Sequence, residues 1–222
     1  MRSLAASVCL FLFGIVSCIH LIAHPVGWTS VEGATKPALM SLLALYVLAS
    51  KGQCALIFAL LLSCAGDILL MQGESSSAFL IGMSCFGAGH VFLIYALKSQ
   101  HRPNSARIVR SAATIYALLC AGLILLIAPG LGSMSIPVAV YSLLLAATAT
   151  ASTGVNGKAA LGGALFFISD TLIATRLAHL PQLPQAGLIV MATYIAGQYL
   201  LASGLLKSAT AANVLRRSDA AE

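Results

Sequence analysis

The chain has 222 residues, of which 59% are hydrophobic and only 8% are charged. In soluble domains about a quarter of the residues are charged. A soluble protein of this length could not bury so much apolar surface, so the composition excludes a soluble protein. The net charge of +6 comes from basic residues near the ends of apolar runs, so it indicates membrane topology and no nucleic-acid partner.

Eight apolar segments approach the roughly 20 residues that a transmembrane helix needs. In chain order we predict spans at residues 4–23, 36–50, 53–72, 77–98, 107–128, 134–152, 158–177 and 186–206. The runs are continuous and do not alternate, which favours helices over the strands of a barrel. Lys36-Pro37 is typical of a helix start and opens the short second span. We therefore expect an all-α polytopic membrane protein with one eight-helix transmembrane domain over residues 1–207 and a polar tail over 208–222.

The basic residues also predict an orientation. With the N-terminus inside, ten of the 12 Lys and Arg residues fall on the inner side, and only Lys36 and Arg176 fall outside. The positive-inside rule then places both termini in the cytoplasm. In a bacterium the membrane would be the cytoplasmic (inner) one.

The chain also shows signs of an internal repeat. Three pairs of landmarks occur in the same order, 100, 103 and 108 residues apart: Pro37 and Pro137, Asp67 and Asp170, and His90 and Gln198. We predict two parallel four-helix repeats, over residues 1–100 and 105–207. In such an arrangement the two aspartates would face each other across the pseudo-symmetry axis.

Asp67 and Asp170 are the most informative residues of the chain. Each lies in a long apolar run, where an acid costs about 2.5 kcal/mol or more. The predicted topology places both in the outer half of the bilayer, together with Lys36, Arg176 and Glu74. We expect them to line a polar pocket, where two carboxylates divide acid and base roles. The alternative is local pairing, for example of Asp170 with Arg176.

Five further polar residues are candidates for the same site, and each has a structural alternative. His90 either takes part in catalysis or is a hydrogen-bonded packing group. Lys36 either neutralises a lipid phosphate or only extends to the headgroups. Tyr95, Tyr194 and Gln198 either orient substrate or bond a neighbouring helix. The cysteines and histidines form no metal-ligand pattern, so we expect no metal and no disulfide.

Short motifs along nearly the whole chain resemble the YhhN/TMEM86 family of lysoplasmalogenase-like membrane proteins. The resemblance rests on Lys36-Pro37, Ala65-Gly66-Asp67, Phe79-x-x-Gly82, Phe86-x-x-x-His90, Tyr95, Gly163 to Asp170, Tyr194 and Gln198. The chain departs from the family mildly before Asp67, where Leu62-Ser63-Cys64 replaces an aromatic-Ser approach.

The resemblance implies an eight-span hydrolase that needs no cofactor. Its substrate would be a lysophospholipid from the bilayer, a lysoplasmalogen, cleaved at the sn-1 vinyl ether. The products would be a fatty aldehyde and glycerophosphoethanolamine or glycerophosphocholine. On this hypothesis Asp67 and Asp170 share the acid and base roles, Lys36 holds the phosphate, and His90 and Gln198 position water.

Two other functions are consistent with the sequence. Parallel repeats and intramembrane acids also suit a proton-coupled small transporter. A non-catalytic lipid-binding membrane protein is the third possibility. In that case replacing the aspartates with asparagine would abolish no activity.

Overall fold

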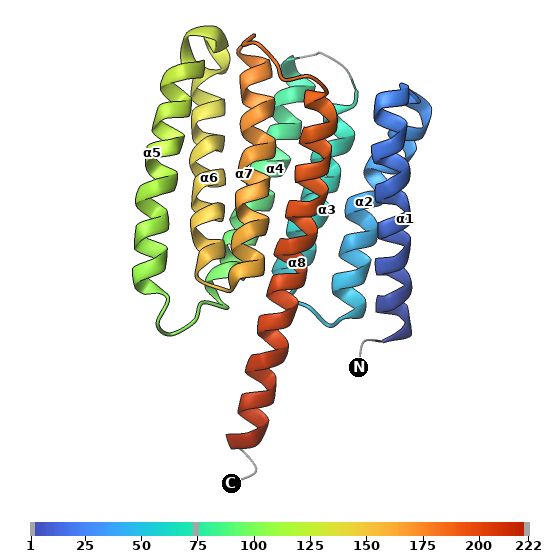
Figure 1. Ribbon diagram of the computed structural model, residues 1–222, viewed down its shortest axis with the longest axis vertical. Helices are drawn as coiled ribbons and strands as arrows, with labels where there is room; N and C mark the ends of the chain where they lie inside the picture. Colours follow the sequence, from blue (N-terminus) through green and yellow to red (C-terminus); the bar gives the residue numbers. More distant parts are fainter. Residues whose placement is uncertain (1–2, 73–75, 220–222) are drawn as a thin grey trace.

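The computed structural model describes residues 3–72 and 76–219 (Figure 1). Across these residues the chain forms eight α-helices, one 3-10 turn and no strand, which confirms the all-α expectation. The helices are α1 (Leu4–Val26), α2 (Thr29–Ala49), α3 (Cys54–Leu70), α4 (Ser76–Lys98), α5 (Ala106–Leu131), α6 (Ser135–Thr153), α7 (Gly157–Leu177) and α8 (Ala186–Asp219), with the turn η1 (Gly132–Met134) between α5 and α6.

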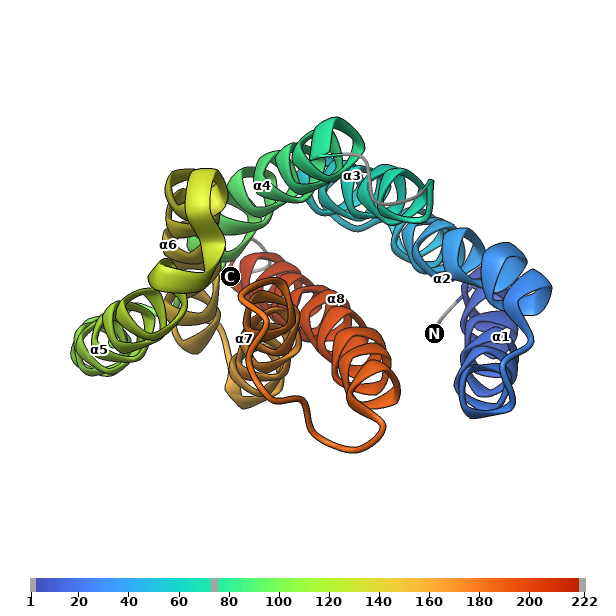
Figure 2. The ribbon, with the colours of Figure 1, turned by 90° about the horizontal axis from the view of Figure 1, so that it is seen from above.

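Successive helices run in opposite directions, so the N-terminal end of α1 and the C-terminal end of α8 lie at the same end of the bundle (Figure 1). Seen from above, α5, α6, α4, α3, α2 and α1 form a curved row, and α7 and α8 lie on its concave side (Figure 2). The central pair α7 and α8 therefore faces both halves of the row.

Six segments are long and apolar enough to cross a membrane. One of them, Ala106–Thr153, has 48 residues and includes both α5 and α6, which fold back on each other at η1 (Figure 1). Helix α3 has only 17 residues and is a shorter apolar helix, at the lower limit of length for a crossing. The protein is an integral, multi-pass membrane protein.

Helix α2 begins earlier than the sequence predicted. It starts at Thr29, so Lys36-Pro37 does not open it, and Pro37 is its ninth residue. A proline inside a transmembrane helix is tolerated where neighbours satisfy the freed backbone groups. Pro37 has no backbone N–H, so the group it frees is the carbonyl of Gly33, one turn earlier. Its own carbonyl accepts bonds from Ser41 Oγ at 2.9 Å and from Cys64 Sγ at 3.3 Å, the second of which joins α2 to α3. The correction moves Lys36 from a helix end to the second turn of α2, within reach of α3.

The last helix is also longer than its predicted span, because α8 continues through Asp219 beyond the other helices (Figure 1). Much of the predicted polar tail is thus a helical extension of α8. The Ala-rich sequence explains this, since alanine has the strongest helix propensity.

Close backbone contacts at glycines hold the helices that carry the aspartates. A Cβ at Gly66 would lie 2.5 Å from the ring of Phe86, beside Asp67, so only glycine lets α3 approach α4 so closely here. A Cβ at Gly162 would lie 2.6 Å from the backbone nitrogen of Leu201 and would separate α7 from α8. Small residues serve this purpose in membrane helices, where apolar burial alone does not drive association.

Candidate functional site

A cavity of about 100 Å³ lies inside the bundle, lined by residues of α2, α3, α4, α6, α7 and α8. Both aspartates line it, although they are 103 residues apart in sequence. Most of the wall is apolar, and the polar side chains in the lining are those of Lys36, Asp67, Tyr141, Ser169, Asp170 and Tyr194. Ordinary ligand pockets hold about 300–1,000 Å³, so this cavity has room for a reacting group and not for a whole lipid.

Asp67 is 3% exposed and has two partners on other helices. Lys36 of α2 places its Nζ 3.6 Å from Asp67 Oδ1, and Tyr194 of α8 donates to Oδ2 at 2.8 Å. A buried acid needs such partners, because an unpaired charge in apolar surroundings is costly. The neighbouring Lys36 favours the ionised carboxylate at this position.

Asp170 is also buried, but its environment is different. Tyr141 of α6 donates its hydroxyl to Asp170 Oδ2, and no Lys, Arg or His of the described chain lies within ion-pair distance of this carboxyl. Among the described residues, the side-chain partner of Asp170 is thus a neutral hydroxyl. The expected alternative, an ion pair with Arg176, is not formed.

His90 lies behind Tyr141 and does not line the cavity. Its Nε2 is 3.3 Å from the Tyr141 hydroxyl, and its Nδ1 is 2.9 Å from Thr148 Oγ1. Thr148 in turn donates to the carbonyl of Leu144 at 3.0 Å, which makes Thr148 Oγ1 the acceptor and His90 Nδ1 the donor. His90 is therefore linked to Asp170 through one tyrosine.

The structure separates the remaining candidates from the cavity. Gln198 is buried and donates to Ser63 Oγ at 3.3 Å, between α8 and α3. Tyr95 is 70% exposed on α4 and is not among the cavity-lining residues. Glu74 lies outside the described residues.

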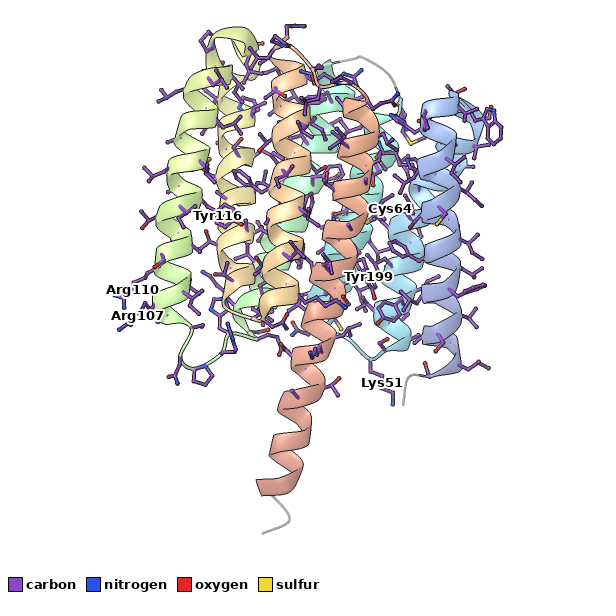
Figure 3. The ribbon with its side chains drawn as sticks, viewed as in Figure 1. Lys51, Cys64, Arg107, Arg110, Tyr116 and Tyr199 are labelled. Carbon is purple, nitrogen blue, oxygen red and sulfur yellow. The ribbon has the colours of Figure 1, made fainter. Side chains whose placement is uncertain are left out.

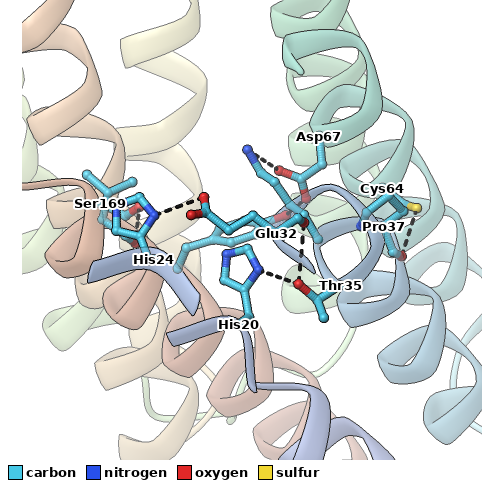
Figure 4. A network of polar contacts seen from close by, with 11 residues as sticks. His20, His24, Glu32, Thr35, Pro37, Cys64, Asp67 and Ser169 are labelled. Carbon is cyan, nitrogen blue, oxygen red and sulfur yellow. Dashed lines mark hydrogen bonds and ion pairs between the residues drawn. The ribbon is translucent and has the colours of Figure 1, made fainter. Parts of the chain in front are cut away.

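A second polar cluster lies between α1 and α2, where His20 and His24 meet Thr35 and Glu32 (Figure 4). His24 Nδ1 is 3.1 Å from Glu32 Oε2, and Glu32 precedes Lys36 by one helical turn. His20 Nδ1 lies 2.8 Å from Thr35 Oγ1, which donates to the carbonyl of Val31 at 2.7 Å. This side of α2 therefore carries a row of polar side chains, and Lys36 in that row pairs with Asp67 of α3.

Sequence reasoning missed two of these residues. Tyr141 is a polar aromatic residue inside an apolar run, the same signal that selected Tyr194, and that signal was available. Glu32 was overlooked because the second span was expected to begin only at residue 36. Once the helix start is moved to Thr29, Glu32 is an acid in the first turn, where the helix dipole favours it.

Comparison with known proteins shows the family of this chain. The model of the YhhN family matches residues 31–205, a region that contains every polar residue of the cavity lining. The chain belongs to the YhhN family. It is 28% identical to human lysoplasmalogenase TMEM86B over 194 residues, which is 86% of this chain and 81% of that protein.

Two further relatives in the same group carry the same name. Lysoplasmalogenase TMEM86B of Sus scrofa is 33% identical over 151 residues, or 68% of this chain and 62% of that protein. The Rattus norvegicus protein of this name is 30% identical over 184 residues, or 82% of this chain and 75% of that protein. No solved structure matches the chain. This YhhN-family protein therefore has lipid-processing relatives across most of its length.

Proposed function

We propose that the protein is a lysoplasmalogenase, which hydrolyses the sn-1 vinyl ether of a lysoplasmalogen to a fatty aldehyde and a glycerophosphoethanolamine or glycerophosphocholine. The observation that carries this proposal is the pair Asp67 and Asp170, which share one apolar cavity and have different partners. The names of the relatives support the same reaction.

The chemistry of the substrate requires an acid. A vinyl ether resists base, but protonation of its β-carbon gives an oxocarbenium ion, which water then attacks. A positioned general acid contributes about 10²–10⁴-fold to such a step. A carboxylate on the other side of the cavity would stabilise the cation and accept a proton from water.

The hydrogen bonds around Asp170 suit it for the role of acid. When His90 donates from Nδ1 to Thr148, a neutral imidazole has only a lone pair left on Nε2. With an ionised Asp170 the Tyr141 hydroxyl donates to the carboxylate. With a protonated Asp170 the same contact reverses: the Tyr141 hydroxyl turns to the lone pair of His90, and the Tyr141 oxygen accepts the proton of Asp170. This arrangement keeps every bond without burying a net charge, which is the costly alternative.

Asp67 suits the complementary role. Its ion pair with Lys36 favours the carboxylate form, so it can stabilise the oxocarbenium ion and take a proton from the attacking water. The resulting hemiacetal then breaks its bond to the glycerol oxygen. Asp67 returns its proton to that oxygen, the hemiacetal hydroxyl returns a proton to Asp170, and the aldehyde leaves. The net reaction consumes one water molecule.

We place the other groups around this pair. Lys36 has three N–H donors, so it can hold the substrate phosphate while remaining next to Asp67. His90 acts through Tyr141 as a positioning residue, and Gln198 holds α8 against α3. The alkenyl chain would lie along the apolar wall, outside the small polar centre.

We also propose eight membrane crossings with both termini in the cytoplasm. Lys51, Arg107 and Arg110 lie at the end of the bundle where α1 begins (Figure 3). The polar side of α2, with Glu32 and Lys36, belongs to the opposite end. Basic residues mark the cytoplasmic side, so the cavity would be nearer the outer leaflet.

The test is aldehyde release by the purified protein from lysoplasmalogen, with the matched 1-alkyl ether lysophospholipid as the control substrate. In D₂O, β-carbon protonation predicts one deuterium at C2 of the product aldehyde. Aldehyde incubated with the protein in D₂O controls for later exchange. Absence of aldehyde from the vinyl ether, or aldehyde without deuterium at C2, would refute the proposed reaction. Proton flux into liposomes without lipid turnover would favour a transporter instead.

A further inference from the structure

A second groove, of about 950 Å³, lies at the end of the bundle opposite to Lys36, between α1, α2, α7 and α8. Three lysines from three helical regions line it: Lys51 follows α2, Lys158 begins α7, and Lys207 lies on α8. Figure 3 shows Lys51 at this end. Among the described residues, the lining contains no acid, so the groove concentrates positive charge.

The charge of these lysines is not compensated by the described part of the chain. The ion pairs found there are His24 with Glu32 and Lys36 with Asp67, and both lie next to the carboxylate cavity. Lys158 Nζ lies 5.0 Å from the centroid of the Tyr199 ring, which holds the ammonium in place without neutralising it.

The position of Lys158 strengthens the positive field. It is the second residue of α7, where the helix dipole already contributes partial positive charge. A cation at that position is unfavourable for the helix alone. An anion bound between the lysines and the N-terminus of α7 would interact favourably with the lysine charges and with the helix dipole.

An unpartnered hydroxyl is a second, independent indication of a ligand. Ser50 Oγ is buried and has no hydrogen-bond partner among the described residues, and Ser50 lines the same groove. The neighbouring hydroxyls differ, because Ser203 and Thr210 donate to backbone carbonyls at 2.7 Å and 2.9 Å. A buried hydroxyl normally finds a partner, so Ser50 has a free donor for a bound acceptor.

We propose that this groove binds an anionic phosphate group, carried either by a phospholipid headgroup or by a soluble phosphate ester. Topology alone requires basic residues at this end of the bundle. It does not require three of them to converge on one groove with a free hydroxyl donor. Basic pockets between transmembrane helices on the cytoplasmic side suit anionic headgroups. The site is separate from the carboxylate cavity and does not depend on the proposed hydrolysis.

The test measures the thermal unfolding midpoint of the full-length protein in detergent while dioctanoyl phosphatidylglycerol, dioctanoyl phosphatidylcholine or inorganic phosphate is added. A ligand that binds only the folded state raises this midpoint. The groove variant is K51Q/K158Q/K207Q. The control K98Q/R107Q/R110Q removes the same number of charges from residues outside the groove lining.

We expect phosphatidylglycerol to raise the midpoint more than phosphatidylcholine does. The groove variant should need about tenfold more ligand, as for the loss of a charge-assisted hydrogen bond, while the control responds like the parent. Competition by millimolar phosphate would identify a soluble ester as the source, and its absence would identify a lipid. Equal losses in both triple variants, or no stabilisation by any ligand, would overturn the proposal.

A milder variant covers the case in which the triple variant does not fold. Ser50→Ala removes only the free hydroxyl, so the unliganded midpoint should not change. The apparent affinity for the bound phosphate compound should fall several-fold. An unchanged affinity would remove the hydroxyl from the site and contradict the proposal.

Discussion

The two buried aspartates lie in one cavity, but the side chains that contact them differ in charge. Asp67 meets a lysine of α2 and a tyrosine of α8, and the lysine belongs to a row of polar side chains along α2. In the part of the chain that the structure describes, Asp170 meets only the hydroxyl of Tyr141, behind which lie a histidine and a threonine.

This difference shows how one residue type can take two roles. A nearby cation favours the ionised form of Asp67, whereas a chain of neutral hydrogen-bonding groups is compatible with a protonated Asp170. The two carboxyl groups therefore share one cavity, but their partners favour different protonation states. Substitutions in each environment should therefore have different consequences for activity.

The largest effect is expected for Asp170→Asn. Asparagine keeps the shape and can still bond Tyr141, but it has no acidic proton to give to the β-carbon. Aldehyde release should fall about 10³-fold, within the range for loss of a general acid. The measurement is single-turnover aldehyde formation by protein with an unchanged unfolding midpoint. Activity within threefold of the parent would exclude Asp170 as the acid.

Asp67→Asn should reduce aldehyde release about 100-fold, because it removes the carboxylate that stabilises the cation. Lys36→Met is the informative partner, since it leaves a buried carboxylate without its cation, a change that costs about 3–5 kcal/mol. The double variant K36M/D67N should regain stability without regaining activity. Thermal unfolding of all three variants checks this, and equal stability of K36M and the double variant would show that the ion pair contributes little.

Much of the fold followed from the sequence because apolar runs determine membrane helices. Most ends of the eight described helices lie within a few residues of the predicted ends. There are two exceptions. Lys36-Pro37 predicts a helix start, but a membrane helix tolerates an internal proline and α2 begins at Thr29. The alanine-rich end of α8 continues that helix beyond its predicted span. The arrangement of α7 and α8 inside a curved row was not predictable, since it depends on tertiary contacts such as the close approach of α7 and α8 at Gly162.

The candidate site was predictable at residues whose burial in a membrane helix costs free energy. An acid in an apolar run is expensive, so Asp67 and Asp170 stood out. The internal repeat predicted that they would meet, and the cavity brings them together. The partners are harder to predict, because a tyrosine in a membrane helix is inexpensive on either face. Tyr95 and Tyr141 give the same sequence signal, yet only Tyr141 points into the bundle.

A pair of conservative changes compares the two environments directly. Tyr141→Phe removes the only described donor to Asp170 and its link to His90, whereas Tyr194→Phe leaves Asp67 with Lys36. A hydrogen bond to a charged or strongly polar group contributes about 1.5–3 kcal/mol. A buried polar group left without a partner costs about 1–3 kcal/mol, and Tyr141→Phe leaves both Asp170 and His90 Nε2 in that state, whereas Asp67 keeps Lys36. We therefore expect Tyr141→Phe to lower aldehyde release about 30-fold and Tyr194→Phe at most about fivefold. Equal losses would mean that the two carboxyl groups depend on their tyrosines in the same way.

The smallest effects separate positioning from catalysis at the two residues of α4. His90→Gln keeps a side chain that can bond Thr148 and Tyr141, so we expect aldehyde release to fall only about threefold. The loss should be in kcat and not in KM, because His90 does not line the cavity. Tyr95→Phe should change neither value, because Tyr95 is exposed away from the cavity. The matched measurement is steady-state aldehyde release with the unfolding midpoint as a fold control. A loss at Tyr95 larger than that at His90 would show that substrate is recognised on the outer face of α4, and the relay from Asp170 through Tyr141 would then lose its support.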